Sequence, residues 1–302
     1  MRFGLVGTGY WASTVHGPGL LRTPQAELVG VAGRNAGKRK ELARRLGVTP
    51  FEDPAELFAR VDAVAFAVPP DVQAPLAVRA ANLGKHLLLE KPVATTASQA
   101  AQIAAAVAAS RAASVVFLTD RYAPEIRKWF DRLRLDGGWR GGWVRGLGSL
   151  DSPGNPYGDS VWRRERGALW DIGPHALSNL TAALGPIDHL SAIAGEGDLT
   201  HLVITHISGA TSTVTISQFA PAAAGTRNET CVWGTAGILE KPLRTTSDAD
   251  TLAIAAAELI EAAETGAKHP IDAAFGAHLV DLLESADRQR SVSRPGTQAR
   301  HA

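Results

Sequence analysis

The residues best suited to proton chemistry form a short stretch, Glu90-Lys91-Pro92, directly after an apolar run at 87–89. If that run is a buried parallel strand, Lys91 lies just past its carboxyl end, the edge at which such sheets bind ligands. Pro92 disfavours the helical region for Lys91 and keeps it extended. A partly desolvated lysine beside a cofactor can exchange a proton near neutral pH. In a random chain the same tripeptide would more often be an exposed loop, so this interpretation depends on its surroundings.

A second candidate pair, Asp171 and His175, lies near the middle of the chain. Pro174 suits the first turn of a helix, and a spacing of four residues would bring both side chains to one side of that helix. A histidine beside a carboxylate can act as a proton-transfer pair. Alternatively, Asp171 caps the helix and His175 is an ordinary helical residue.

A glycine-rich turn at residues 7–12 predicts a phosphate-binding site. Gly7 allows a tight turn, and Gly9 lets the backbone approach a pyrophosphate. Ala12 stands where a small residue permits close packing of helix on strand, and the helix N-terminus would face the phosphates. The alternative is a purely structural glycine turn. The residues assigned to this part of the pocket are Gly7, Thr8, Gly9, Tyr10 and Trp11.

The end of the next strand, predicted at 28–32, should select the cofactor. NAD-binding proteins usually carry an acid there for the ribose hydroxyls, whereas this chain continues with Gly33 and Arg34. Gly33 leaves room for a phosphate, and Arg34 can pair with it bidentately. We therefore expect a preference for NADP(H), with NAD(H) as the alternative, unless these residues are only a solvated helix start. The expected contacts are Gly33, Arg34, Asn35 and Lys38.

The elements that position these residues alternate over the first 120 residues. This alternation is typical of a doubly wound parallel sheet, so residues 1–120 are predicted to form a dinucleotide-binding Rossmann domain in an α/β protein. The predicted strands are 3–6, 28–32, 61–68, 87–89 and 114–118, and the predicted helices are 10–22, broken near Gly17-Pro18-Gly19, 38–46, 72–83 and 96–110.

Residues 121–302 are predicted to form an α+β domain with a mostly antiparallel open sheet, for substrate binding and oligomerisation. An open sheet exposes an apolar face that usually marks an interface, so we expect a homodimer or homotetramer. The predicted strands are 187–194, 200–207, 211–219 and 229–234; the helices are 123–135, 174–184, 248–265 and 273–289; glycine-rich turns fill 137–148, a loop fills 151–160, and the tail from Ser291 is frayed.

The composition excludes several classes of function. A length of 302 residues suits about two domains, and a net charge of +1 gives no basic field for nucleic acid. No stretch approaches the roughly 20 apolar residues of a membrane span, and the N-terminal apolar run is too short for a signal peptide. The single cysteine, Cys231, fits a reducing cytoplasm. The histidines lack zinc-like spacing, so no metal site is expected, and His16 is interpreted as a structural or surface residue.

The motifs, taken in order, resemble those of the Gfo/Idh/MocA family, the glucose–fructose oxidoreductase and inositol dehydrogenase group. The resemblance covers nearly the whole chain. It depends on Gly7-Thr8-Gly9-Tyr10-Trp11-Ala12, Glu90-Lys91-Pro92 and Asp171-Ile172-Gly173-Pro174-His175, with supporting matches at Arg121-Tyr122 and Trp162-Arg163.

The resemblance implies an NAD(P)-dependent oxidoreductase that moves a hydride between nicotinamide and a CH–OH/C=O group of a sugar, cyclitol or related polyol. Lys91 would then hydrogen-bond the reacting oxygen, His175 would serve as the acid/base, and Asp171 would help to position the substrate. Glu90 would lie near the nicotinamide. The other cofactor contacts that the resemblance implies are Val68, Pro69, Gln73, Lys91, Arg121, Trp162 and Arg163.

The chain departs from the family pattern at 68–73, where Gln73 replaces a histidine and Pro70 an asparagine. This bears on individual cofactor contacts and not on cofactor binding itself. Two other functions remain open: a non-catalytic dinucleotide-binding sensor or regulatory protein, and an enzyme that acts on an imine, a conjugated double bond or a dihydrodiol. The presence of Lys91, Asp171 and His175 together favours an enzyme over a sensor.

Overall fold

The computed structural model describes residues 1–293, which divide into two compact units. The first unit comprises residues 1–127 and 244–281, and the second comprises residues 128–243 and the chain from Leu282 onward. Residues 244–281 therefore belong with the N-terminal unit, although they follow the predicted boundary at residue 120 by more than a hundred positions. Most of the tail predicted to fray lies outside the described residues, and 291–293 continue the last helix.

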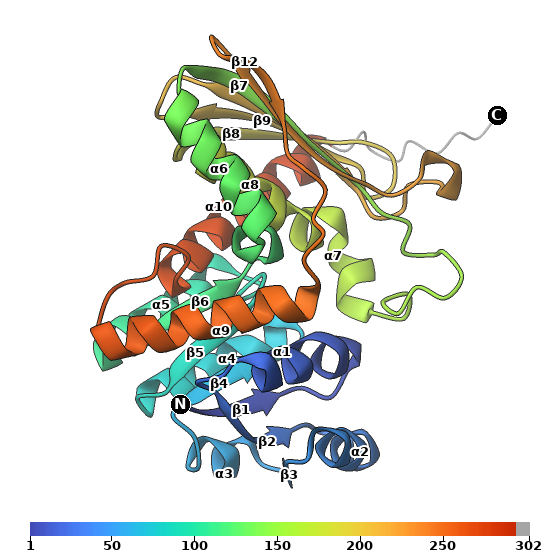
Figure 1. The fold of residues 1–302 in the computed structure, drawn as a ribbon. Coiled ribbons are helices and arrows are strands. Elements are labelled where there is room, and N and C mark those ends of the chain that lie inside the picture. Colours follow the sequence, from blue (N-terminus) through green and yellow to red (C-terminus); the bar gives the residue numbers. More distant parts are fainter. Residues whose placement is uncertain (294–302) are drawn as a thin grey trace, which may run out of the picture. The chain divides into compact units, whose positions relative to one another are not determined.

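The first unit is built on a parallel sheet, as predicted, and the sheet has six strands, of which the one at Thr49–Phe51 was not predicted (Figure 1). The strand order, β3-β2-β1-β4-β5-β6, reverses between β1 and β4, and dinucleotides bind at such a reversal. Strands β4 and β6 are buried along their whole length, which explains their continuous apolar sequences. The strands are β1 Arg2–Val6, β2 Glu27–Ala32, β3 Thr49–Phe51, β4 Ala63–Phe66, β5 His86–Glu90 and β6 Ser114–Phe117.

Helices cover this sheet, and the first helix differs from its prediction. The break predicted at Gly17-Pro18-Gly19 is wrong: helical residues run without interruption over 10–22, through a π-helical turn, η1 Ala12–His16, into α1 Gly17–Arg22. Pro18 lies inside this run and has no N–H to donate, and the Ser13 carbonyl five residues earlier accepts from the Arg45 side chain at 2.5 Å. The other helices of this unit are α2 Ala36–Leu46, α3 Pro54–Phe58, α4 Pro70–Asn82, α5 Ala97–Ser110, η2 Thr119–Tyr122 and α9 Asp248–Thr265, with the first parts of α6 Pro124–Asp136 and α10 Ala273–Ser293.

Helix α9 shows why residues 244–281 join the first unit. It packs against α1, β5 and β6, far from them in sequence (orange in Figure 1). Gly19 makes the approach of α1 to α9 possible, because a Cβ there would lie 2.6 Å from Leu252 Cδ2.

The second unit contains a six-stranded mixed sheet in the order β12-β11-β7-β10-β9-β8. Only the β7–β10 pair is parallel, so the predicted mostly antiparallel sheet is confirmed. The turns predicted at 137–148 are wrong, because β7 occupies most of that stretch. Its glycines make room for neighbours: a Cβ on Gly141 would lie 2.7 Å from the Trp233 ring. The strands are β7 Trp139–Leu147, β8 Ile187–Ala194, β9 Thr200–His206, β10 Thr211–Ser217, β11 Arg227–Gly234 and β12 Gly237–Glu240.

The two faces of this sheet differ in exposure. Helix α8, Gly173–Leu184, packs against β7, β10 and β11 on one face. The alternate side chains point the other way, and Ile193, Val203 and Trp233 are about half exposed there. The unit also contains α7, Val161–Asp171, which the sequence did not predict, and the short helix η3, Ala222–Ala224.

Candidate active site

The glycine-rich turn has the geometry that a pyrophosphate site needs. Gly7 has a φ of 130°, and a Cβ there would lie 2.3 Å from the Ala67 carbonyl oxygen, so only glycine fits. A Cβ on Gly9 would meet nothing within 4 Å, which leaves open space beside the backbone. Ala12 is fully buried, as close helix–strand packing requires. The turn therefore fits the dinucleotide that its sequence predicts.

The end of β2 presents basic and amide side chains, and no acid follows the strand. Arg34, Asn35 and Lys38 are exposed, and the Asn35 side chain caps α2 by accepting the Lys38 N–H at 2.9 Å. The next residue, Arg39, is buried, donates to the Gly33 carbonyl at 2.6 Å and pairs with Glu52 at 3.1 Å. Arg39 therefore holds the backbone of Gly33, and the side chains of Arg34, Asn35 and Lys38 beside it are exposed.

The turn that carries Lys91 follows β5 and contains a cis Lys91–Pro92 peptide. Gln73 braces this turn from a fully buried position in α4. Its Oε1 accepts the Glu90 N–H at 2.8 Å, and its Nε2 donates to the carbonyls of Glu90 at 2.8 Å and Val93 at 3.1 Å. The family resemblance implied that Gln73 contacts the cofactor. The structure shows that its side chain holds the turn of Lys91, a role that the sequence did not indicate.

The Glu90 side chain points into the unit and is largely buried. Its Oε1 accepts from Trp11 Nε1 at 2.6 Å and contacts His16 Nε2 at 2.8 Å, while its Oε2 accepts the Lys91 N–H at 3.2 Å. His16 is completely buried, so the surface alternative for this residue is excluded. The dinucleotide turn and the lysine turn therefore meet at one carboxylate.

Three further predicted cofactor contacts lie in the same unit. Val68 and Pro69 stand between β4 and α4 on the carboxyl side of the sheet, partly and well exposed respectively. Arg121 lies in η2, where burial lowers the pKa of its guanidinium, which still remains charged. These positions fit the predicted pocket, and their contacts with a cofactor stay predictions.

In the second unit, Asp171 and His175 do not share one helix as predicted. Asp171 ends α7, Ile172 is the N-cap of α8, and His175 lies in the first turn of α8. The physical reason is Pro174, whose ring and missing N–H prevent one helix from running through both residues. The capping alternative is also wrong, because Ile172 occupies the N-cap.

Asp171 forms an ion pair with Arg163, at 3.1 Å between its Oδ2 and the arginine Nε. The Arg163 guanidinium also lies over the rings of Tyr157 and Trp162, with centroid distances of 4.3 and 4.7 Å. These contacts orient the Asp171 carboxylate and assemble the aromatic pair around one cation.

Asp198 is a site-supporting residue that the sequence did not reveal. Its Oδ2 accepts the N–H groups of Ala168 and Gln218, each at 2.9 Å, and its Oδ1 accepts the Ser217 hydroxyl at 2.6 Å. The Ala168 bond falls directly after Gly167, whose φ of 67° interrupts α7. Asp198 therefore anchors the short segment that ends in Asp171.

The predicted catalytic residues divide between the units: Lys91 lies in the first, and Asp171 and His175 lie in the second. Their meeting in one site stays a prediction. Within residues 1–293, no group of three or more His, Cys, Asp or Glu side chains is placed to hold a metal ion. None of the described helices combines the length and hydropathy needed to cross a bilayer.

Two family models match consecutive parts of the chain. Residues 1–118 match the oxidoreductase family with an NAD-binding Rossmann fold, and residues 132–240 match the GFO/IDH/MocA C-terminal domain. The chain belongs to the GFO/IDH/MocA oxidoreductase family. The two matches cover about three quarters of the chain, and they confirm the resemblance that the motifs carried.

Relatives within the GFO/IDH/MocA family include the uncharacterized oxidoreductase YdgJ of Escherichia coli K12, 31% identical over 61% of this chain and 54% of that protein. The inositol 2-dehydrogenase of Rubrobacter xylanophilus is 36% identical over 40% of this chain and 36% of its own length. This chain thus spans about half the length of these curated relatives, or less. A levoglucosan dehydrogenase solved with NADH has a TM-score of 0.87 over 97% of both chains, and at 18% identity this likeness concerns the fold alone.

Proposed function

We propose that this chain is an NADP(H)- or NAD(H)-dependent oxidoreductase that interconverts a secondary alcohol and a ketone on a sugar, cyclitol or related polyol. The observation that carries the proposal is the Lys91 turn, which Gln73 and Glu90 hold at the carboxyl end of β5 and join to the dinucleotide turn. Relatives named as inositol 2-dehydrogenase and galactose 1-dehydrogenase support the substrate class.

Each side chain has a defined task in this proposal. The dinucleotide, when bound, supplies or accepts the hydride. Lys91 binds and polarises the reacting oxygen, His175 accepts or returns its proton, and Asp171, held by Arg163, orients the substrate. Arg121, Trp162 and Arg163 are proposed as further contacts of the dinucleotide.

The test is a substrate screen followed by one substitution. Sugars, inositols and diols are screened with both dinucleotides by nicotinamide absorbance, and the active substrate is then used with Lys91→Ala. Turnover should fall by about 100-fold or more, since general acid–base groups contribute roughly that much. Dinucleotide affinity, measured by titration, should change by less than about threefold.

Lys85→Ala is the matched control, because Lys85 flanks the other end of β5 and its ammonium group donates to the Val61 carbonyl, at 2.9 Å. Turnover should survive this change. Unchanged turnover in Lys91→Ala would refute the mechanism. Dinucleotide binding without turnover on any compound would favour the sensor, and activity restricted to imines or dihydrodiols would change the substrate class.

We further propose that NADP(H) is the preferred dinucleotide. The exposed Arg34 and Lys38 beside Gly33 support this preference, because they can pair with a 2′-phosphate. A clearly lower Michaelis constant for NADH than for NADPH would refute this proposal.

A homodimer or homotetramer, assembled through the open face of the second unit's sheet, is the proposed assembly. The half-exposed Ile193, Val203 and Trp233 on that face support it.

A further inference from the structure

The helix after the dinucleotide turn contains a π-helical turn whose effect is local and specific. Trp11 and His16 are five residues apart, yet both reach the same atom, Glu90 Oε1. In an α-helix, residues five apart point about 140° away from each other, since each residue turns the helix by ~100°. The i→i+5 pattern of the π turn at Ala12–His16 brings the two side chains to one side.

The hydrogen-bond roles around Glu90 follow from its chemistry. Trp11 Nε1 donates to Oε1, because an indole N–H can only donate, and His16 Nε2 donates to the same oxygen in the tautomer that carries its proton on Nε2. The second oxygen is committed to the Lys91 N–H. A carboxylate that is 8% exposed needs such donors, because burial without them is costly. Glu90 therefore joins the helix at 10–22 to the turn that carries Lys91.

His16 is not explained by packing. Its ring is fully buried against the edge of Phe117, and its Nδ1 finds no hydrogen-bond partner among residues 1–293. An apolar side chain would avoid that unpaired atom. What the imidazole provides, and an apolar residue would not, is the Nε2 donor to Glu90.

We propose that Trp11, His16 and Glu90 form a positioning relay that couples occupancy of the dinucleotide turn to the placement of Lys91. Trp11 belongs to the turn that receives the dinucleotide, and Glu90 holds the backbone of Lys91 through its other oxygen. His16 contacts the same Glu90 oxygen as Trp11 and so orients the carboxylate between them. The relay rests on the proposed function only in assigning to Lys91 the binding and polarisation of the reacting oxygen.

The first experiment measures hydrogen exchange of the Lys91 amide by NMR, with and without saturating dinucleotide. In the natural chain, dinucleotide should slow this exchange by about tenfold or more. In Trp11→Phe, which keeps the ring and loses the donor, the dinucleotide should still bind, and the slowing should shrink to less than about threefold. Trp129→Phe is the control, because the indole N–H of Trp129 is buried without a partner among residues 1–293.

The second experiment separates positioning from folding at His16. His16→Gln keeps a donor near the Nε2 position, whereas His16→Leu removes it. The rate constant of hydride transfer in a single turnover should fall by about tenfold in His16→Leu and recover to within about threefold in His16→Gln, with dinucleotide affinity little changed in both.

Equal slowing of exchange in Trp11→Phe and the natural chain would overturn the relay, because the dinucleotide would then shield Lys91 directly. A natural rate of hydride transfer in His16→Leu would also overturn it. If the natural chain shows no turnover, the proposed function fails, while the exchange experiment still decides the relay.

Discussion

At the scale of single residues, the contact between Thr8 and Gly33 bears on cofactor choice. A Cβ on Gly33 would lie 2.6 Å from Thr8 Cγ2 and 3.0 Å from its Oγ1. An acid at position 33, where NAD-binding proteins usually have one, would therefore collide with the threonine. Thr8 and the close approach at Gly33 together leave no room for the acid. A change of preference from NADP(H) to NAD(H) therefore requires both residues to be replaced.

We expect Thr8→Ala combined with Gly33→Asp to move the preference towards NADH. The threonine methyl group and hydroxyl are removed, and the new carboxylate accepts ribose hydroxyls while repelling a 2′-phosphate. The ratio of kcat/KM for NADPH to that for NADH should fall by at least about tenfold, equivalent to ~1.4 kcal/mol. Steady-state kinetics with each dinucleotide measures this ratio.

Single substitutions provide the controls for this prediction. Gly33→Asp alone should lose activity with both dinucleotides because of the clash with Thr8. Arg34→Ala should weaken NADPH selectively, whereas Lys40→Ala, which removes the same charge from an exposed position on α2, should not. An unchanged preference in the double variant would show that the ribose is bound elsewhere.

At the scale of elements, regular patterns were predictable and irregular backbone was not. The apolar runs of β4 to β6 and the alternation along β9 and β10 predicted those strands because burial repeats along them. The glycines of β7 suggested turns, since the neighbours that fill their space, such as the Trp233 ring beside Gly141, lie far along the chain. The π turn at Ala12–His16 was not predicted, and the contact it allows, between His16 and Glu90, joins residues 74 positions apart.

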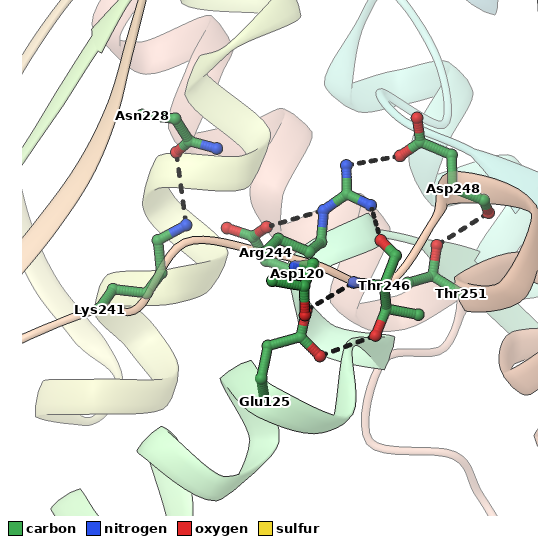
Figure 2. Close-up of polar contacts among 9 residues, drawn as sticks. Asp120, Glu125, Asn228, Lys241, Arg244, Thr246, Asp248 and Thr251 are labelled. Carbon is green, nitrogen blue, oxygen red and sulfur yellow. Dashed lines mark hydrogen bonds and ion pairs between the residues drawn. The ribbon is translucent and has the colours of Figure 1, made fainter.

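The chain returns from the second unit to α9 through a segment held by Glu125 (Figure 2). The Glu125 carboxylate accepts the N–H groups of Thr245 and Thr246 and the Thr246 hydroxyl. Arg244 lies between Asp120 and Asp248, at 3.8 and 2.6 Å, as Figure 2 also shows. These contacts fix the start of α9 on the first unit.

The contacts of Glu125 with Thr245 and Thr246 predict a specific dependence of the stability on pH. Burial alone would raise the pKa of Glu125, but hydrogen bonds from Thr246, its own backbone and Thr245 lower it from 4.5 to about 2. A lowered pKa in the folded state stabilises the fold above about pH 4.5, and this contribution is lost as the pH falls towards 2. Because the carboxylate is mostly solvated, we expect about 1 kcal/mol.

Glu125→Gln tests these contacts by urea unfolding across that pH range. The variant should be less stable than the natural chain at pH 6, and the difference should close as the pH approaches 2. Glu264→Gln, an exposed position near the end of α9, should show no such convergence. A constant difference between Glu125→Gln and the natural chain would contradict the assignment.

At the scale of the whole molecule, some residues of the candidate site were predictable from the sequence and others were not. Lys91, Asp171 and His175 were recognisable because each stands in a short local motif. Gln73 and Asp198 act through partners 17 to 30 positions away, so their roles required the fold. The pairing of Asp171 with Arg163, eight residues earlier, depends on the interruption of α7 at Gly167.

The open sheet face has the chemistry of an interface between two copies of this chain. Val203, Thr213 and Trp143 face the same way on neighbouring strands, in direct register. Arg145 and Glu229 pair on this face, so their charges cancel and do not hold two copies apart. Stable interfaces bury about 800 Å² on each partner, an area that a six-stranded sheet can supply.

We therefore expect light scattering to give two or four times the 31.7 kDa of one chain. Val203→Lys places a charge on this face and should raise the dissociation constant by at least about 100-fold, because an unpaired charge is costly to bury. Val161→Lys, the same change at a more exposed position on α7, should leave the mass unchanged. A monomeric natural chain at working concentration would contradict the proposed assembly. An oligomer that tolerates Val203→Lys would place the interface outside this sheet face.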